Sequence, residues 1–163
     1  MNRATLSLAW VLALTGPTLA ATADMAMDRY FSIWADNARI TPETVDRLYA
    51  SHVVYYGKAM TPSQVLRDKQ AYIRQWPRRR YAVIPGSVSK TCDAGRSRCQ
   101  VSAILSWEKA GRGGARGERG ANTIRLTLVR EGGALKIARE SGTPVVRSSC
   151  RDGNQGWRCS AYR

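Results

Sequence analysis

The sequence predicts an α+β protein in which three N-terminal helices pack on a curved antiparallel sheet. Two observations carry this prediction. Apolar residues recur with a helical period up to Trp76, and they alternate with polar residues in most segments after Tyr81. The later segments are joined by short connections, which favour an antiparallel meander because parallel strands need longer crossovers.

The first predicted helix covers residues 24–38, with apolar side chains at the i, i+3, i+4, i+7 spacing of one helical face. These side chains are Met27, Tyr30, Phe31 and Trp34. The second and third helices each begin with a threonine N-cap followed by proline, at Thr41 and Thr61. We expect the second to end near His52, and the third to end at Trp76 because a proline follows.

An aromatic and β-branched segment predicts a short strand between the second and third helices, at residues 53–57. Four further strands are predicted from apolar and polar alternation. They cover residues 81–90, 99–108, 123–130 and 134–140. We expect a bend or bulge in the first of them at Pro85-Gly86.

Residues 1–23 have the features of a secretory signal peptide. Arg3 precedes an apolar run, and small residues follow up to Ala23. The run is shorter than the roughly 20 residues that span a bilayer, so we expect cleavage before Asp24 rather than an uncleaved anchor. The mature chain then has one folded domain at 24–146 and a basic C-terminal tail at 147–163, in the periplasm or outside the cell.

The four cysteines all lie in the part that is predicted to be exported, where disulfides persist. Three pairings are open. We favour Cys92 with Cys99 and Cys150 with Cys159, because each pair brackets a short polar loop. A zinc site is the competing interpretation, but the short Cys-x-x-Cys spacing is absent and the single histidine is distant, so we expect no metal.

The stretch RQWPRRRY over residues 74–81 raises a choice between a nucleic-acid patch and a corner from helix to sheet. In a strand, alternation would place Arg79 beside Tyr81 and would place Arg78 and Arg80 on the opposite face. Because the arginines are divided between two faces, we interpret the stretch as a corner.

The formal net charge of +14 favours anionic partners without specifying a fold. The glycine-rich segment at 108–121 predicts a solvated hairpin tip with three exposed arginines, Arg112, Arg116 and Arg119. Arg-Gly segments can bind nucleic acid, but this one contains no aromatic residue and belongs to an exported chain. Anionic lipid headgroups or envelope polymers are the better candidates for an electrostatic partner.

The motifs YYGK, TPSQVLRDKQAYIRQWPRRRY and IARESG, together with the cysteine-bracketed hairpin, resemble an exported bacterial protein of the NTF2-like family with a SnoaL-like cone. The resemblance implies a pocket enclosed by the helices and the concave face of the sheet. It also implies a homodimer, as in many relatives. It does not choose an activity, because one fold hosts many functions.

An enzyme on this fold would use a pocket carboxylate or histidine as a base, beside a hydrogen-bond donor such as Tyr55 or Tyr56. The candidates are Asp36, Asp46, Asp68, His52 and Glu140. Two of them also have a structural interpretation: His52 as a helix-end residue and Glu140 as the partner of an arginine at a strand end. Alternation places Glu140 opposite Ile137 on the last strand.

We therefore expect a noncatalytic module, without a cofactor, that binds a small apolar ligand or an envelope partner. The alternatives are a small isomerase, dehydratase or hydrolase, and an electrostatic binder of anionic envelope polymers. The expected pocket-lining residues are aromatic: Tyr30, Trp34, Tyr55, Tyr56, Tyr72 and Trp76.

Overall fold

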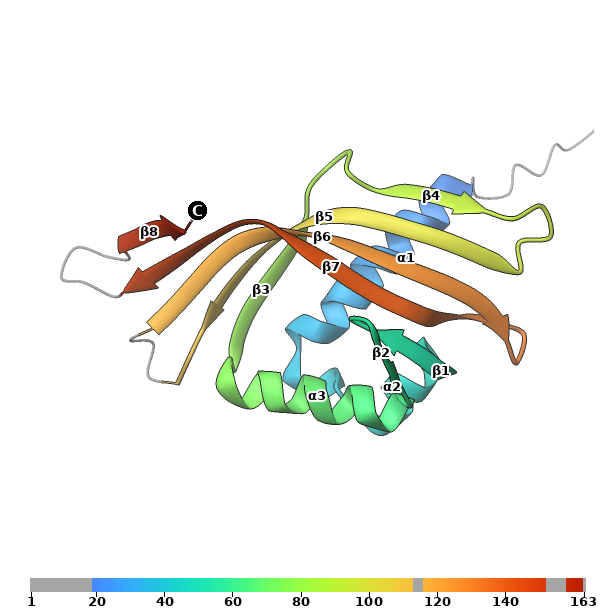
Figure 1. The fold of residues 1–163 in the computed structure, drawn as a ribbon, viewed down its shortest axis with the longest axis horizontal. Helices are drawn as coiled ribbons and strands as arrows, with labels where there is room; N and C mark the ends of the chain where they lie inside the picture. The colour runs from blue at the N-terminus through green and yellow to red at the C-terminus, as the bar shows by residue number, and fades with distance from the viewer. Residues whose placement is uncertain (1–18, 113–115, 152–157, 163) are drawn as a thin grey trace, which may run out of the picture.

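A curved sheet arches over a layer of helices in the computed structural model, which describes residues 19–112, 116–151 and 158–162 (Figure 1). The helices are α1 (Leu19–Ala35), α2 (Pro42–Leu48), α3 (Pro62–Gln75) and the short 3-10 helix η1 (Asn37–Arg39). The strands are β1 (Tyr49–Tyr55), β2 (Lys58–Met60), β3 (Arg78–Val83), β4 (Ser89–Cys92), β5 (Arg98–Ala110), β6 (Arg116–Glu131), β7 (Ala134–Arg151) and β8 (Arg158–Tyr162). The predicted α+β class is confirmed.

The strand order is β2-β1-β7-β6-β5-β3, with β4 paired to β5 and β8 paired to β7. Strands β3 to β7 form the predicted antiparallel meander. However, β1 runs parallel to β7, so the sheet is mixed. The predicted interruption near Pro85-Gly86 separates β3 from β4, and Gly86 adopts φ +75° there, a conformation that glycine tolerates best.

The predicted starts of the second and third helices are confirmed by their caps, whereas α1 begins at Leu19, before the predicted residue 24. The hydroxyl of Thr41 accepts from the backbone N–H of Thr44. At the start of α3, Thr61 and Gln64 form a capping box, in which each side chain bonds the backbone N–H of the other residue. In the described residues, no helix is both long enough and apolar enough to cross a membrane.

Two helix ends differ from the prediction. The helix α1 ends at Ala35, and η1 follows it. The helix α2 ends at Leu48, and β1 begins at Tyr49, which pairs with Ile137 of β7. Pairing with the sheet therefore overrides the local helical pattern. His52 lies inside β1 rather than at a helix end, so its predicted helix-end role was wrong.

The arginine stretch is a corner, as predicted. Trp76 caps α3, and β3 begins at Arg78. The exposure of β3 alternates, with Arg79 partly buried and its two neighbours exposed. The Arg79 guanidinium donates to the carbonyl oxygens of Trp34 and Trp76 and to the side chain of Asn37. It thus joins the ends of α1 and α3 to the sheet.

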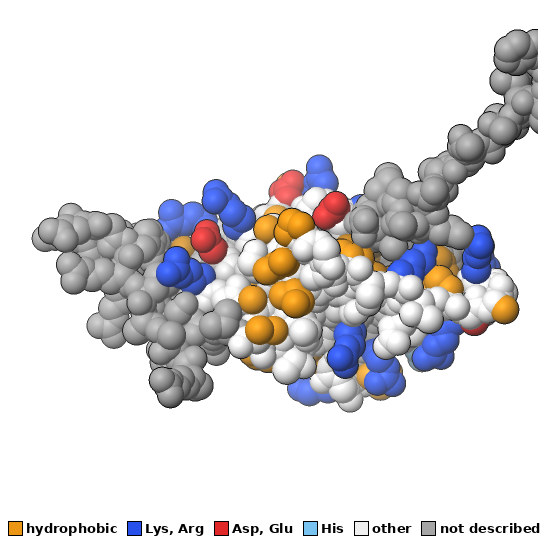
Figure 2. All heavy atoms as spheres, turned by 90° about the horizontal axis from the view of Figure 1, so that it is seen from above, with side chains coloured by type: hydrophobic (Ala, Val, Ile, Leu, Met, Phe, Trp, Pro, Cys, Tyr) orange, Lys and Arg blue, Asp and Glu red, His pale blue; other side chains and the backbone are white. Residues whose placement is uncertain are grey.

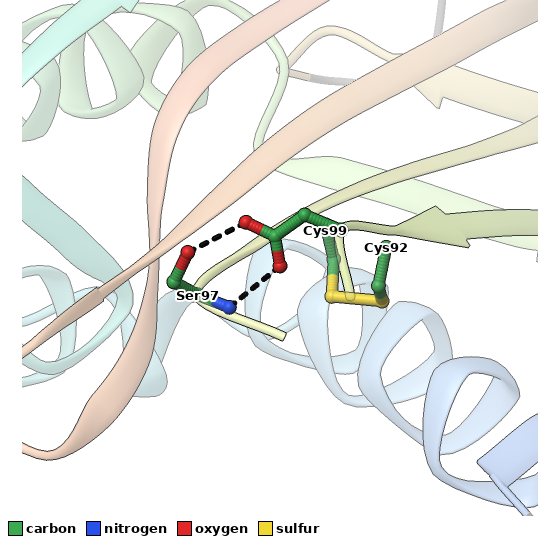
Figure 3. Close-up of a disulfide and its surroundings, with 4 residues drawn as sticks. Cys92, Ser97 and Cys99 are labelled. Atoms are coloured by element: carbon green, nitrogen blue, oxygen red, sulfur yellow. Dashed lines mark hydrogen bonds between the residues drawn. A yellow bond between two sulfur atoms is a disulfide. The ribbon is translucent and has the colours of Figure 1, made fainter. Parts of the chain in front are cut away.

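The disulfide between Cys92 and Cys99 is present, as predicted, and connects β4 to β5 (Figure 3). The loop between them is closed by Asp93, which accepts from the backbone N–H and the hydroxyl of Ser97 at 2.8 and 2.6 Å. The hydrogen bond from the Ser97 hydroxyl is the main cause that lowers the pKa of the Asp93 carboxyl.

The C-terminal segment continues the sheet. Strand β7 crosses the predicted domain boundary at 146/147, and β8 pairs with it. The backbones of Cys150 and Cys159 are partners in this pairing. Their side chains lie outside the described part, so the second disulfide stays a prediction.

The core lies between the helices and the concave face of the sheet. The predicted faces of the first helix and of the second and third long strands are buried there. Its residues include Met27, Tyr30, Phe31, Trp34, Val45, Val65, Val101, Leu105, Ile124 and Leu126.

The opposite, outer face of the sheet is seen in Figure 2, where hydrophobic side chains form a strip with Lys and Arg around it. Large apolar side chains that are exposed on the molecule include Ile84, Leu135 and Val145. The homodimer expected from the resemblance stays a prediction.

Candidate functional site: an aromatic cavity with two lysine–glutamate pairs

A cavity of about 500 Å³ lies between α1, α3 and the concave face of the sheet. Five of the six aromatic residues that were expected to line a pocket are in its wall. They are Tyr30, Trp34, Tyr55, Tyr56 and Tyr72. Trp76, the sixth, is buried next to the cavity and is not part of its lining. That these residues bind a ligand stays a prediction.

A β-bulge turns Glu140 toward this cavity. Alternation from Ile137 predicts that Glu140 lies on the other face of β7. Instead, Ile137 pairs with Leu128 of β6, and Arg139 pairs with Thr127, which directly precedes Leu128. Ala138 therefore has no partner of its own on β6 and is an extra residue. The extra residue reverses the alternation. Glu140 is consequently 1% exposed and lines the cavity, and its predicted position opposite Ile137 was wrong.

Both carboxylate oxygens of Glu140 have partners. The Lys69 ammonium donates to Oε1 at 3.0 Å, and the Tyr49 hydroxyl donates to Oε2. Lys69 also lies 3.4 Å from the hydroxyl of Tyr30. The partner of Glu140 is therefore a lysine of α3 rather than an arginine, and the pair joins α3 to β7.

Aromatic rings surround the Lys69 ammonium. Its Nζ lies 4.4 Å from the centroid of the Trp34 ring and 5.2 Å from that of Tyr55. These distances fall within the range of cation–π attraction. We call Lys69, Glu140, these rings and the adjoining Tyr30 and Tyr49 the first cage.

A second lysine–glutamate pair lies beside the C-terminal end of α3. Lys109 and Glu118 are register partners on β5 and β6, and their charged atoms are 3.1 Å apart. The Lys109 ammonium lies 4.3 Å from the ring of Trp76, 5.2 Å from that of Trp107 and 5.3 Å from that of Tyr72. We call this group the second cage. Lys109 lines the same cavity as Lys69.

Burial and the nearby carboxylate shift the tyrosines of the first cage in one direction. Burial is the main cause that raises the pKa values of Tyr30, Tyr49 and Tyr55, and the negative charge of Glu140 adds to it. These hydroxyls therefore stay protonated at any ordinary pH.

Two of the predicted catalytic candidates, Asp36 and His52, lie outside the cavity. Asp36 is exposed, caps η1 and pairs with Arg39 at 3.3 Å. His52 is exposed on β1 and lies 3.2 Å from the hydroxyl of Ser51. Neither lines the cavity. Of the candidates, the structure brings Glu140 and Asp68 to the site, whereas Asp46 is exposed and lies outside the lining.

The hairpin between β5 and β6 is more regular than its glycine content suggests. Strand β5 extends to Ala110 and β6 begins at Arg116, so the connection is shorter than predicted. Arg112 and Arg119 are exposed. The side chain of Arg116 lies outside the described residues, and the binding role of all three arginines stays a prediction.

The sequence reasoning did not single out Lys69, Lys109, Glu118 or Tyr49. One signal was available for Lys69, because Lys69, Tyr72, Ile73 and Trp76 have the i, i+3, i+4, i+7 spacing of one helix face. A lysine on a face of aromatic and aliphatic residues is a candidate for the cavity wall.

No group of metal-ligating side chains suited to hold a metal is found among the described residues.

No model of a known protein family matches the sequence, and no curated protein matches it. Solved structures do resemble its fold. An uncharacterised protein with a cystatin-like fold from Caulobacter vibrioides superposes with a TM-score of 0.61 at 16% identity, over 77% of this chain and 89% of that one. An NTF2-like superfamily protein from Salmonella enterica gives a TM-score of 0.60 at 7% identity, over 77% and 92% of the two chains.

A proposed dehydratase of the NTF2-like family from Streptomyces avermitilis gives a TM-score of 0.63 at 12% identity, over 77% of this chain and 96% of that one. At such identities the likeness concerns the fold rather than the chemistry. The helices beneath a curved, unclosed sheet give this chain an NTF2-like fold.

Proposed function

We propose that the cavity binds a small, largely planar organic molecule that carries an anionic or carbonyl group. One observation carries the proposal: an open volume of about 500 Å³ is walled by aromatic rings that surround the Lys69 ammonium. Apolar cavities with a few placed polar groups are typical ligand sites. The rings would contact the plane of the ligand, and Lys69 would donate to its oxygen.

The polar groups of the wall favour a ligand that accepts hydrogen bonds. Four basic side chains line the cavity, namely Lys58, Lys69, Arg79 and Lys109, against two acidic ones, Asp68 and Glu140. The indole N–H of Trp34, in the same wall, is buried with no acceptor among the described residues. A buried donor without an acceptor costs free energy, which a ligand oxygen could offset.

Binding is favoured over catalysis because Glu140 is already engaged. Its two oxygens bond Lys69 and Tyr49, and its side chain is 1% exposed. A general base needs a lone pair within reach of the substrate proton. In this arrangement, Glu140 mainly fixes Lys69 in position.

A second candidate function is proton transfer next to a carbonyl group. It is favoured by the same buried carboxylate beside tyrosine hydroxyls, and an NTF2-like neighbour is named as a proposed dehydratase. Glu140 would take a proton from the carbon next to the carbonyl, and the electron pair of that bond would form the enolate. Lys69 or Tyr30 would donate to its oxygen. The proton would then return to carbon.

Deuterium exchange tests this second function. Ketones with a hydrogen on the neighbouring carbon would be incubated with the protein in heavy water and followed by NMR. Exchange that depends on Glu140, and is lost in Glu140→Gln, would support proton transfer. Equal exchange with and without the protein would leave binding as the function of the cavity.

We also propose that the protein acts after export. The support is the N-terminal pattern of residues 1–23 and the disulfide between Cys92 and Cys99, since disulfides persist in oxidising compartments. The mass of the protein purified from the periplasm tests this. A chain that begins at Asp24 supports export, and a full-length chain in the cytoplasm contradicts it.

Binding itself is tested with naphthoate, an aromatic monocarboxylate, by quenching of tryptophan fluorescence. We expect saturable binding to one site. A variant that extends a ring into the cavity, Ile73→Trp, should abolish it, whereas Arg125→Gln, on an exposed residue outside the lining, should not. Absence of binding in the native protein to naphthoate and to a panel of aromatic ketones would contradict the proposed function.

A further inference from the structure

We infer that the ligand carries two anionic groups at opposite ends, one held at Lys69 and the other at Lys109. The inference rests on the proposed function and narrows its ligand class to elongated dianions with an apolar middle. Its basis is that the cavity wall contains two lysines, each of which is paired with a glutamate that is less exposed than the lysine.

In both pairs the lysine is the more accessible partner. The side chain of Lys69 is 16% exposed and that of Glu140 is 1% exposed. The corresponding values are 12% for Lys109 and 5% for Glu118. Each carboxylate thus lies deeper than its ammonium. Both lysines line the cavity, so each pair presents its positive group to a ligand.

The helix α3 sets the distance between the two ends. The first cage has its lysine at position 69, and the second cage places the Lys109 ammonium over Trp76. Seven residues separate these positions, and a helix rises 1.5 Å per residue, so the backbone positions from which the two cages are built lie about 10 Å apart along α3. Between them, Tyr72 and Ile73 present an aromatic and an aliphatic side chain to the cavity.

The local chemistry suits an anion at both cages. An ammonium group has three donors, so an ion pair with one carboxylate is compatible with a hydrogen bond to a ligand oxygen. Aromatic rings around the ammonium exclude water, which strengthens its attraction to a further oxygen. A carboxylate of the ligand would therefore form a charge-assisted hydrogen bond at each end.

A purely structural role for the two pairs would produce a different result. In that case the cavity would select ligands by shape and apolar area, and a second charge at the far end of a ligand would weaken binding through desolvation. The affinity for matched ligands with one and two carboxylates separates the two interpretations.

We would measure binding of three probes to the mature protein by calorimetry. They are a biphenyl with a carboxylate at each para end, the same biphenyl with one carboxylate, and ortho-phthalate, whose two carboxylates are adjacent on one ring. We expect the long dicarboxylate to bind at least about tenfold tighter than the monocarboxylate. Phthalate should gain no such advantage, because its adjacent carboxylates cannot reach opposite ends of the cavity.

Two charge-neutral double variants test the ends separately. Lys109→Gln/Glu118→Gln removes one ion pair without leaving a buried charge, and Lys69→Gln/Glu140→Gln does the same at the other end. Each should reduce the affinity for the long dicarboxylate to about that of the monocarboxylate. The control Arg125→Gln removes a positive charge outside the cavity and should preserve the difference. Circular dichroism would check that each variant is folded.

The possible results distinguish this inference from the proposed function. If the monocarboxylate binds as tightly as the long dicarboxylate, the two-ended ligand is wrong and the aromatic cavity keeps its proposed function. If the dicarboxylate advantage persists in Lys109→Gln/Glu118→Gln, the second end has been assigned to the wrong residue and the inference fails. If no aromatic probe binds, with or without charge, the proposed function fails as well.

Discussion

Lys69 and Glu140 form an ion pair of 3.0 Å in which the carboxylate is almost completely buried and the ammonium faces the cavity. The pair joins α3 to β7 across the core. Removing one charge from a buried pair leaves the other uncompensated, whereas removing both does not. The stability of the fold and the chemistry of the site therefore depend on the same two residues.

The first prediction concerns the stability of this pair. We expect Lys69→Met to lower the free energy of unfolding by about 3–5 kcal/mol, because Glu140 is left buried without its counter-charge. The double variant Lys69→Met/Glu140→Gln should lose less than Lys69→Met alone. Urea unfolding measures both. Arg39→Met, which breaks an exposed pair with Asp36, is the control and should cost less than about 1 kcal/mol.

The hydroxyl of Tyr49 is the subject of the second prediction. It donates to Glu140, and the Tyr49 side chain is fully buried. Replacing it in Tyr49→Phe removes a hydrogen bond to a charged acceptor, so we expect a loss of about 1.5–3 kcal/mol in urea unfolding. Tyr56→Phe, at a half-exposed tyrosine, is the matched control. Equal losses in the two variants would show that the Tyr49 hydroxyl has no special role.

Much of the fold follows from local patterns, because caps and alternation act over a few residues. The capping box at Thr61 and the corner at Arg79 are examples. The site depends on contacts between distant segments, which such patterns do not contain. The bulge at Ala138 reverses the face of Glu140, and it is visible only as a mismatch between β6 and β7. Likewise, Lys109 and Glu118 meet only because the β5–β6 register is fixed.

Ionisation of the buried tyrosines gives the third prediction. The pKa values of Tyr30, Tyr49 and Tyr55 are raised in the folded state, first by burial. Near pH 11 these hydroxyls should remain protonated, whereas an unfolded chain ionises its tyrosines at about pH 10. Because the unfolded state then loses more protons, the contribution of these tyrosines to the free energy of unfolding should be constant below about pH 10 and should fall above it.

Ultraviolet absorbance of tyrosinate tests this prediction. At about pH 11 the folded protein should show at least three fewer tyrosinates than the same protein in urea. Unfolding monitored by circular dichroism should release them together. A titration of all tyrosines near pH 10 in a chain that is still folded would contradict the burial of the first cage.

The fourth prediction concerns the disulfide between Cys92 and Cys99, which closes a short loop at the end of a hairpin. Cross-linking restricts the unfolded chain, and for a loop of this size the stabilisation is about 2 kcal/mol. Reduction should therefore lower the midpoint of urea unfolding while the folded state keeps its secondary structure. The double variant Cys92→Ser/Cys99→Ala should be less stable by a similar amount, and its unfolding should respond less to the reductant.

Because this hairpin lies outside the cavity lining, both the reduced protein and the variant should bind aromatic probes with unchanged affinity below the unfolding transition. A loss of binding on reduction, with circular dichroism unchanged, would show that the disulfide shapes the site as well as the fold.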